Sequence, residues 1–108
     1  MNDITHYTYR VIWSAEDGEF VGQVAEFPSL SWLSESQTEA LSGIVHLVDE
    51  VVADLAESGE RIPVPFGERH YSGEFKVRIP PELHRSLAIR AAEEHVSLNR
   101  LVSTRLAS

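Results

Sequence analysis

The chain has 108 residues, which is enough for one small domain or for a domain with a small appendage. Its content of 43% hydrophobic and 24% charged residues is that of a globular protein and argues against disorder. It has no cysteine, which excludes disulfides and thiolate metal sites, and no segment reaches the ~20 uninterrupted apolar residues of a membrane helix. The first residues also lack the basic start and apolar run of a signal peptide. We therefore expect a cytoplasmic protein without a membrane partner.

Charge is divided unevenly along the chain. Residues 1–72 contain three Arg and thirteen Asp or Glu, a net charge of −10, whereas residues 73–108 contain six Lys or Arg and four Glu, a net charge of +2. Together they make the overall charge of −8. The C-terminal part is thus the better candidate for binding nucleic acid, and the acidic part suits a basic protein partner.

The first part of the chain predicts a small antiparallel sheet. Residues 7–13 (YTYRVIW) and 19–25 (EFVGQVA) are rich in aromatic and β-branched residues and flank a turn at residues 14–18 (SAEDG), which predicts a hairpin. Pro28 ends the second strand, and residues 30–33 (LSWL) are a short candidate for a third.

A helix should follow from residue 36 and end before Gly59. Ser36 or Thr38 can cap it, and its apolar residues recur at helical spacing: Leu41, Ile44, Val45, Val48, Val52 and Leu55. Packed on one face of the sheet, this helix would complete an α+β lobe. The proline-rich residues 62–66 can form at most an edge strand, and residues 67–72 read as a linker. We place the domain boundary at residue 70, between domains 1–70 and 71–108.

Residues 73–108 predict a strand and two helices. In the strand, side chains alternate between an apolar face (Phe75, Val77, Ile79) and a polar one (Glu74, Lys76, Arg78). Pro80 and Pro81 end the strand and start a helix, and Ser97 is a good N-cap for the second helix. Because about 36 residues rarely fold alone without disulfides or metals, we expect two copies to pair their strands antiparallel.

A two-stranded ribbon of this kind fits the major groove of DNA. The stretch FKVRIPPELHRSLAIRAAEEHVSLNRLV resembles the ribbon-helix-helix repressors. The resemblance implies that the outward strand side chains contact base edges: Glu74, Lys76 and Arg78. It also implies that the backbone at the start of the second helix holds a phosphate, as helix N-termini do: Ser97, Leu98 and Asn99. The alternative is that Lys76 and Arg78 are merely the solvated face of an edge strand.

The N-terminal lobe resembles the HicB antitoxin family. The motifs are an acidic hairpin turn at residues 16–18, EFPSL at residues 26–30, TEAL at residues 38–41 and GERIPVP at residues 59–65. The sequence departs from the family pattern at Ser29, where glycine is usual. Together with the ribbon-helix-helix pattern, the resemblance covers nearly the whole chain.

The resemblance implies a type II antitoxin with an α+β fold, in which a reduced RNase H-like lobe precedes a ribbon-helix-helix dimerisation module. The lobe would bind and neutralise a small, basic, mRNA-cleaving toxin of the HicA type through Glu16, Asp17, Trp32 and Glu35. The C-terminal homodimer would bind operator DNA and repress its own operon, and contacts between lobes would make a tetramer. The alternative is a stand-alone ribbon-helix-helix regulator whose lobe senses a small ligand.

We expect no enzyme activity, no metal and no cofactor. A two-metal nuclease needs three or four converging carboxylates, and the acids of the turn and of the long helix read as solvated surfaces. His46 lies three residues before Asp49, but a lone histidine in an apolar helix is more often a packed or partner-facing residue. The other histidines lack metal-ligand spacing.

The two tryptophans differ in their surroundings. Trp13 is expected to pack in the core, where its large area stabilises most. Trp32 lies in a short serine-flanked segment, so it could pack in the core or be an exposed anchor for a partner.

Overall fold

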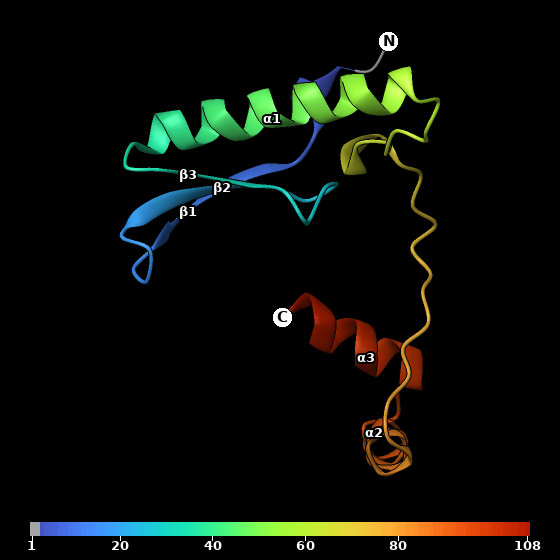
Figure 1. The fold of residues 1–108 in the computed structure, drawn as a ribbon. Coiled ribbons are helices and arrows are strands. Elements are labelled where there is room, and N and C mark those ends of the chain that lie inside the picture. Colours follow the sequence, from blue (N-terminus) through green and yellow to red (C-terminus); the bar gives the residue numbers. More distant parts are fainter. Residues whose placement is uncertain (1–2) are drawn as a thin grey trace. The chain divides into compact units, whose positions relative to one another are not determined.

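The computed structural model describes residues 3–108, which divide into two compact units (Figure 1). The first unit runs to Tyr71 and the second from Ser72 to Ser108. Among the described residues, no helix combines the length and the apolar character that crossing a membrane requires.

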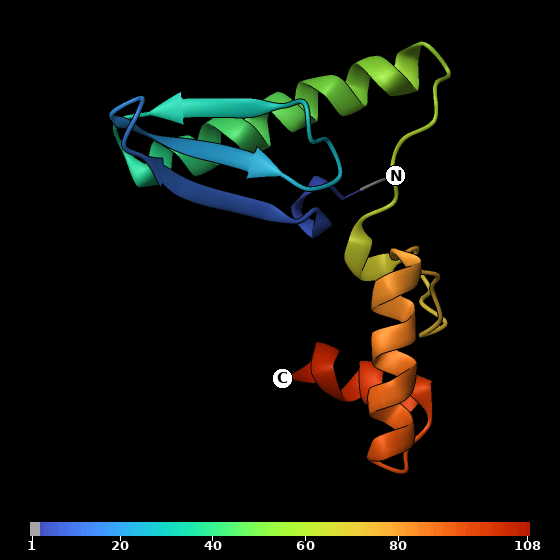
Figure 2. The ribbon, with the colours of Figure 1, turned by 90° about the horizontal axis from the view of Figure 1, so that it is seen from below.

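The first unit contains a three-stranded antiparallel sheet and one long helix, which lies behind the sheet in the view of Figure 2. After a short 3-10 turn, η1 (Ile4–His6), the strands β1 (Tyr9–Ser14), β2 (Glu19–Val24) and β3 (Ser31–Ser34) lie in the order β1-β2-β3. The predicted α+β class and the predicted third strand are therefore confirmed.

The helix α1 (Gln37–Glu57) covers one face of the sheet, and a glycine allows the close approach. The register aligns Val11, Gly22 and Trp32 in one cross-strand row. A Cβ at Gly22 would lie 2.5 Å from the carbonyl oxygen of Ala40, so any larger residue would push the helix backbone away from the sheet.

The helix α1 begins and ends where its capping residues predict. The side-chain oxygen of Ser36 accepts a hydrogen bond from the Glu39 N–H at 3.3 Å, and Gly59 after the last turn has φ +70°, which favours glycine. Tyr7, Val24, Ile44 and Val48 form the core between helix and sheet. Half-buried side chains surround this core: Ile4, Tyr9, Phe27, Leu30, Leu47 and Val52.

The segment after α1 returns along the first unit without forming a strand. Residues 62–66, predicted to form at most an edge strand, lead into a 3-10 turn, η2 (Phe66–Glu68). The Tyr7 hydroxyl donates a hydrogen bond to the Pro63 carbonyl at 2.8 Å. This bond fastens the segment to the start of the sheet.

A buried carboxylate makes a second attachment. Glu26 is 8% exposed, and its two oxygens accept hydrogen bonds from the Phe66 N–H (2.8 Å), the Thr8 N–H (2.9 Å) and the Thr8 hydroxyl (3.0 Å). Burial alone would raise the pKa of Glu26, but the bonds from Phe66 and Thr8 outweigh it and hold the pKa below its usual value. The ionised carboxylate thus joins the segment after α1 to the sheet.

The second unit consists of an extended stretch and two helices, α2 (Pro81–Glu93) and α3 (Leu98–Ala107). Pro81 occupies the first turn of α2, where a missing N–H costs no hydrogen bond. Ser97 caps α3 by accepting from the Arg100 N–H at 3.0 Å, and His95 takes a left-handed φ of 58° between the helices. Both helices and the Ser97 cap are as predicted.

Candidate functional site

The predicted strand at residues 74–79 does not form in this single chain. A strand requires a ladder of hydrogen bonds to a neighbour, and the described residues offer this segment none. Phe75 is 73% and Val77 65% exposed, although both are large and apolar. The polar side chains of the segment are exposed as well: Glu74, Lys76 and Arg78. The alternation is present in the sequence, but both faces of residues 74–78 are exposed, and Ile79 at the end of the segment is half-buried.

The core of the second unit is thin. Among the described residues of this unit, its buried side chains are Ala91 and Leu101, each 4% exposed. The large side chains Leu83, Ile89 and Leu106 are between 46% and 67% exposed. A unit of this size with so much uncovered apolar surface lacks the burial needed to be stable alone.

The N-terminus of α3 presents free backbone donors. Leu98 and Asn99 are its first two residues, and the N–H groups of a first turn have no acceptor within the helix. Ser97, Leu98 and Asn99 therefore have the backbone geometry of an anion site.

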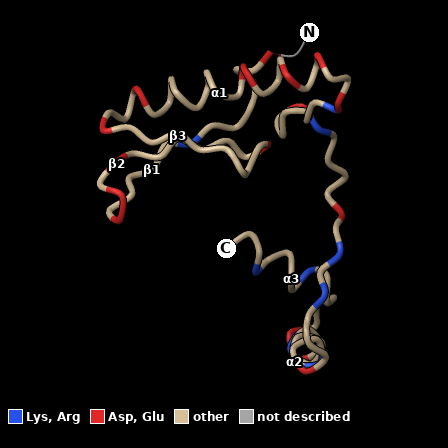
Figure 3. Tube along the Cα trace, viewed as in Figure 1, with Lys and Arg blue, Asp and Glu red and all other residues tan. Residues whose placement is uncertain are grey.

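Three of the four residues predicted to contact a toxin lie at the same end of the sheet. Glu16 and Asp17 are in the turn after β1, and Glu35 follows β3. Because Phe20 pairs with Ser34, both connections leave the sheet at that end. Figure 3 shows acidic segments at the hairpin turn and just before α1. The fold thus gathers acids that are far apart in sequence.

Trp32 is the second residue of β3 and packs directly against α1. A Cβ at Gly43 would lie 2.1 Å from the indole Nε1, so the indole occupies the space that a side chain at Gly43 would need. Trp32 is nevertheless 40% exposed. Trp32 is therefore packed on α1 and partly exposed, and its role as an anchor for a partner stays a prediction.

The prediction that Trp13 packs in the core is wrong. Trp13 is 56% exposed and contacts Phe20 edge to face, with ring centroids 5.0 Å apart. The reason is the position of α1, which packs mainly on β2 and β3 and leaves the end of the outer strand β1 uncovered. Strand periodicity indicates which face a residue is on, but not how far a helix covers that face. An exposed tryptophan, packed on a half-buried phenylalanine, therefore lies beside the acidic turn.

Two histidines of the first unit, His6 and His46, pair with carboxylates at the surface. Among residues 3–108, no group of three or more His, Asp or Glu side chains could hold a metal ion. His46 pairs with Glu50, at 3.1 Å between Nε2 and Oε1, rather than with Asp49. A hydrogen bond to Glu68 raises the pKa of His6, with a smaller contribution from Asp3. The lack of enzyme activity stays a prediction.

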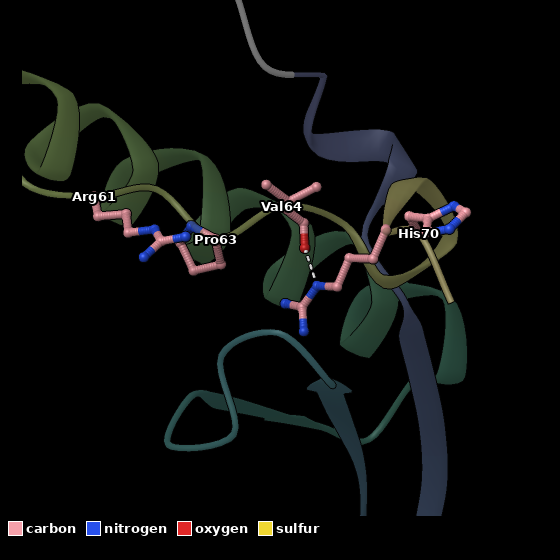
Figure 4. Close-up of a pocket in the computed structure, with 5 residues that line it drawn as sticks. Arg61, Pro63, Val64 and His70 are labelled. Carbon is pink, nitrogen blue, oxygen red and sulfur yellow. Dashed lines mark hydrogen bonds between the residues drawn. The ribbon is translucent and has the colours of Figure 1, made fainter. Parts of the chain in front are cut away.

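A pocket in the first unit was not indicated by any sequence motif. Its lining residues are Arg61, Pro63, Val64, Arg69 and His70 (Figure 4). All of them belong to the segment after α1, so two arginines and a histidine line one pocket in an otherwise acidic unit. A local signal existed, since these basic residues lie within ten positions of one another, but spacing alone does not distinguish such residues from a solvated loop.

Comparison with known proteins gives one match. The model of the HicB family matches residues 57–106, from the last residue of α1 almost to the end of α3. The match includes the exposed segment at residues 74–79 and both helices of the second unit, and it supports membership of the HicB family. It is consistent, in general, with a HicB-type antitoxin. No curated protein and no solved structure matches the chain.

Proposed function

We propose that this protein is the antitoxin of a HicA/HicB-type toxin–antitoxin system and represses its own operon. The second unit would pair with that of another copy as a ribbon-helix-helix dimer on operator DNA. The first unit, as a reduced RNase H-like lobe, would neutralise the toxin. The observation that carries the proposal is the uncovered alternating segment at residues 74–79, which precedes a thin two-helix unit within the HicB-matched stretch.

Dimerisation would cover the apolar surface that the single chain exposes. Burying a Phe or Val side chain stabilises by about 1.5–3 kcal/mol, so Phe75 and Val77 of two copies would contribute roughly 6–12 kcal/mol. Association costs about 4–15 kcal/mol in lost freedom of motion. Since the two ranges overlap, burial of the ribbon does not by itself ensure association, and exposed helix side chains such as Leu83 and Ile89 would add to the gain if they also became buried.

The paired ribbon would present a polar face to DNA. Lys76 and Arg78 can each make bidentate contacts to guanine, which discriminate by about 1–3 kcal/mol against other bases. Glu74 can accept a hydrogen bond from cytosine N4. The N-terminus of α3, at Ser97 to Asn99, would bind a phosphate and set the register.

The acidic end of the first unit would meet the toxin. A toxin that cleaves mRNA binds a polyanion, so its binding surface is expected to be basic. Residues 1–72 carry a net charge of −10, and Glu16, Asp17 and Glu35 lie at one end of the sheet. Complementary charge speeds association and selects the partner, while the partly exposed Trp32 and Trp13 would add apolar anchors. Contacts between lobes of two dimers would make a tetramer.

The repressor half is tested by titrating the full-length protein against its own upstream DNA and unrelated DNA at two salt concentrations. Phosphate contacts alone give binding that weakens steeply with salt and lacks sequence preference. We expect operator-selective binding, which Arg78→Ala weakens by about 1–3 kcal/mol with the dimer intact. Arg105→Ala, which removes the same charge from the last turn of α3, is the control. An absence of selective binding at either salt would contradict the repressor assignment.

The antitoxin half is tested by searching the flanking genes for a small basic protein and co-expressing any such protein with this one. We expect restored growth and a complex whose association slows as salt rises. Calorimetric titration of the same purified protein with small molecules tests the alternative. A saturable small ligand, without toxin binding, would indicate a ligand-sensing regulator instead.

A further inference from the structure

We propose that the pocket lined by Arg61, Arg69 and His70 holds a phosphate of the DNA backbone beside the operator half-site. This inference rests on the proposed DNA binding. It adds a contact made by the first unit to those of the ribbon and of α3.

The pocket concentrates the few cationic groups of an acidic unit. Residues 1–72 contain no Lys and three Arg, and two of those arginines line this pocket together with His70. No acidic side chain lines it, and the carboxylate of the nearby Glu68 is engaged by His6. In the part of the chain that the structure describes, neither Arg61 nor Arg69 forms an ion pair. Two positive charges are therefore available to a ligand.

The guanidinium of Arg69 is held in position before any ligand binds. It lies over the Phe66 ring at 3.9 Å from the centroid, and its Nε donates to the Val64 carbonyl at 2.9 Å, the dashed line in Figure 4. These contacts use one face of the guanidinium and one of its five N–H groups. The terminal N–H groups remain, and a planar pair of such donors suits a phosphate.

The backbone that carries the pocket is also fixed. The Tyr7 hydroxyl holds Pro63, and the buried Glu26 carboxylate holds the Phe66 N–H, on either side of Val64. Ordering a loop on binding costs free energy, so a segment already fastened to the sheet loses less. The pocket is thus a better anion site than the same residues would be on a free linker.

Chain connectivity keeps the pocket near any DNA that the ribbon binds. Arg69 precedes Lys76 by seven residues, which span at most about 25 Å when fully extended. One turn of B-DNA extends about 34 Å. With Lys76 in the major groove, Arg69 would be less than one turn away, which favours a phosphate just outside the half-site.

The test is the salt dependence of operator binding by the full-length protein. Each phosphate contact contributes about 0.9 to the slope of log K against log salt. We expect Arg61→Gln and Arg69→Gln each to lower that slope by up to about 1 per protomer, while the preference for operator over unrelated DNA stays unchanged. Arg10→Gln removes the third arginine of the first unit, on β1, and should leave the slope unchanged. Arg69→Lys keeps the charge and should retain most of the slope.

The outcomes separate this inference from the proposed function. If the unaltered protein shows no selective operator binding, the repressor assignment fails, and this inference with it. If it binds and both glutamine variants match Arg10→Gln, the pocket has no role on DNA. Saturable inorganic phosphate binding that Arg69→Gln abolishes, with an unchanged DNA slope, would overturn the DNA assignment in favour of a small phosphorylated ligand. Thermal unfolding checks that each variant is folded. If Arg69→Gln is unstable, the salt slope of Arg61→Gln alone decides the test.

Discussion

The two units of this chain bury their apolar side chains to very different extents. In the first unit, Val24, Ile44 and Val48 are at most 2% exposed between helix and sheet. In the second unit, Phe75 and Val77 are more than 60% exposed, and the buried side chains are Ala91 and Leu101. The first unit can be stable as one chain, whereas the second has the composition of half a domain. The difference indicates which unit would gain stability from the proposed pairing with a second copy.

Of the substitutions considered, Phe75→Ala should have the largest effect, and it should act on the stability of the proposed dimer. If two ribbons pair, the substitution removes a buried phenyl group from each, at a cost of roughly 3–6 kcal/mol per dimer. Sedimentation equilibrium should show a weaker dimer, which dissociates at a much higher protein concentration than the unaltered dimer does. Circular dichroism should show that the first unit keeps its fold. Glu74→Ala, on the other face of the same segment, is the control. An unaltered dissociation constant for Phe75→Ala would show that the second unit does not dimerise through this face.

Ile44→Ala should damage the first unit and spare the second. The side chain is 0% exposed, and removing it leaves a cavity that costs about 2–5 kcal/mol in free energy of unfolding. Urea denaturation of the full-length protein measures this loss. Leu41→Ala, one helical turn earlier and 43% exposed, should cost much less. Equal losses for the two variants would mean that the core does not lie where the structure places it.

Glu26→Gln should weaken the attachment of the segment after α1. The substitution removes one acceptor oxygen and the charge, and leaves donors of Thr8 or Phe66 unsatisfied, at a cost of about 1–3 kcal/mol. Hydrogen exchange at the Phe66 and Thr8 amides should quicken more than exchange at the centre of α1. Uniformly faster exchange would argue for a global rather than a local effect.

The same carboxylate predicts a pH dependence. Its folded pKa lies below the ordinary value of 4.5, so the unfolded state binds more protons at acidic pH. Its contribution is fully present above that value and is lost as the pH falls through the folded pKa. The thermal unfolding midpoint, measured between about pH 3 and pH 7, should decrease as the pH is lowered, and it should decrease less in Glu26→Gln. A parallel fall in both proteins would assign the acid sensitivity to other groups.

The success of the sequence predictions follows the range of the interactions involved. The caps at Ser36 and Ser97 depend on residues three positions away, and both form as predicted. Trp13 was misplaced because its burial depends on where a helix some thirty residues later lies. The strand at residues 74–79 was predicted from alternation, yet its hydrogen bonds require a neighbour that one chain does not supply.

By itself, the sequence determined the hairpin, the third strand, the three α-helices and their order, the opposite charges of the two halves and the apolar and polar alternation of residues 74–79. These properties depend on local propensity and on periods of two and 3.6 residues, which can be read along the chain. Only the tertiary structure decided the burial of Glu26 against Phe66, the exposure of Trp13 beside the acidic turn, and the placement of Arg61 and Arg69 along one pocket. Such features depend on which distant residues meet, and no local pattern specifies that.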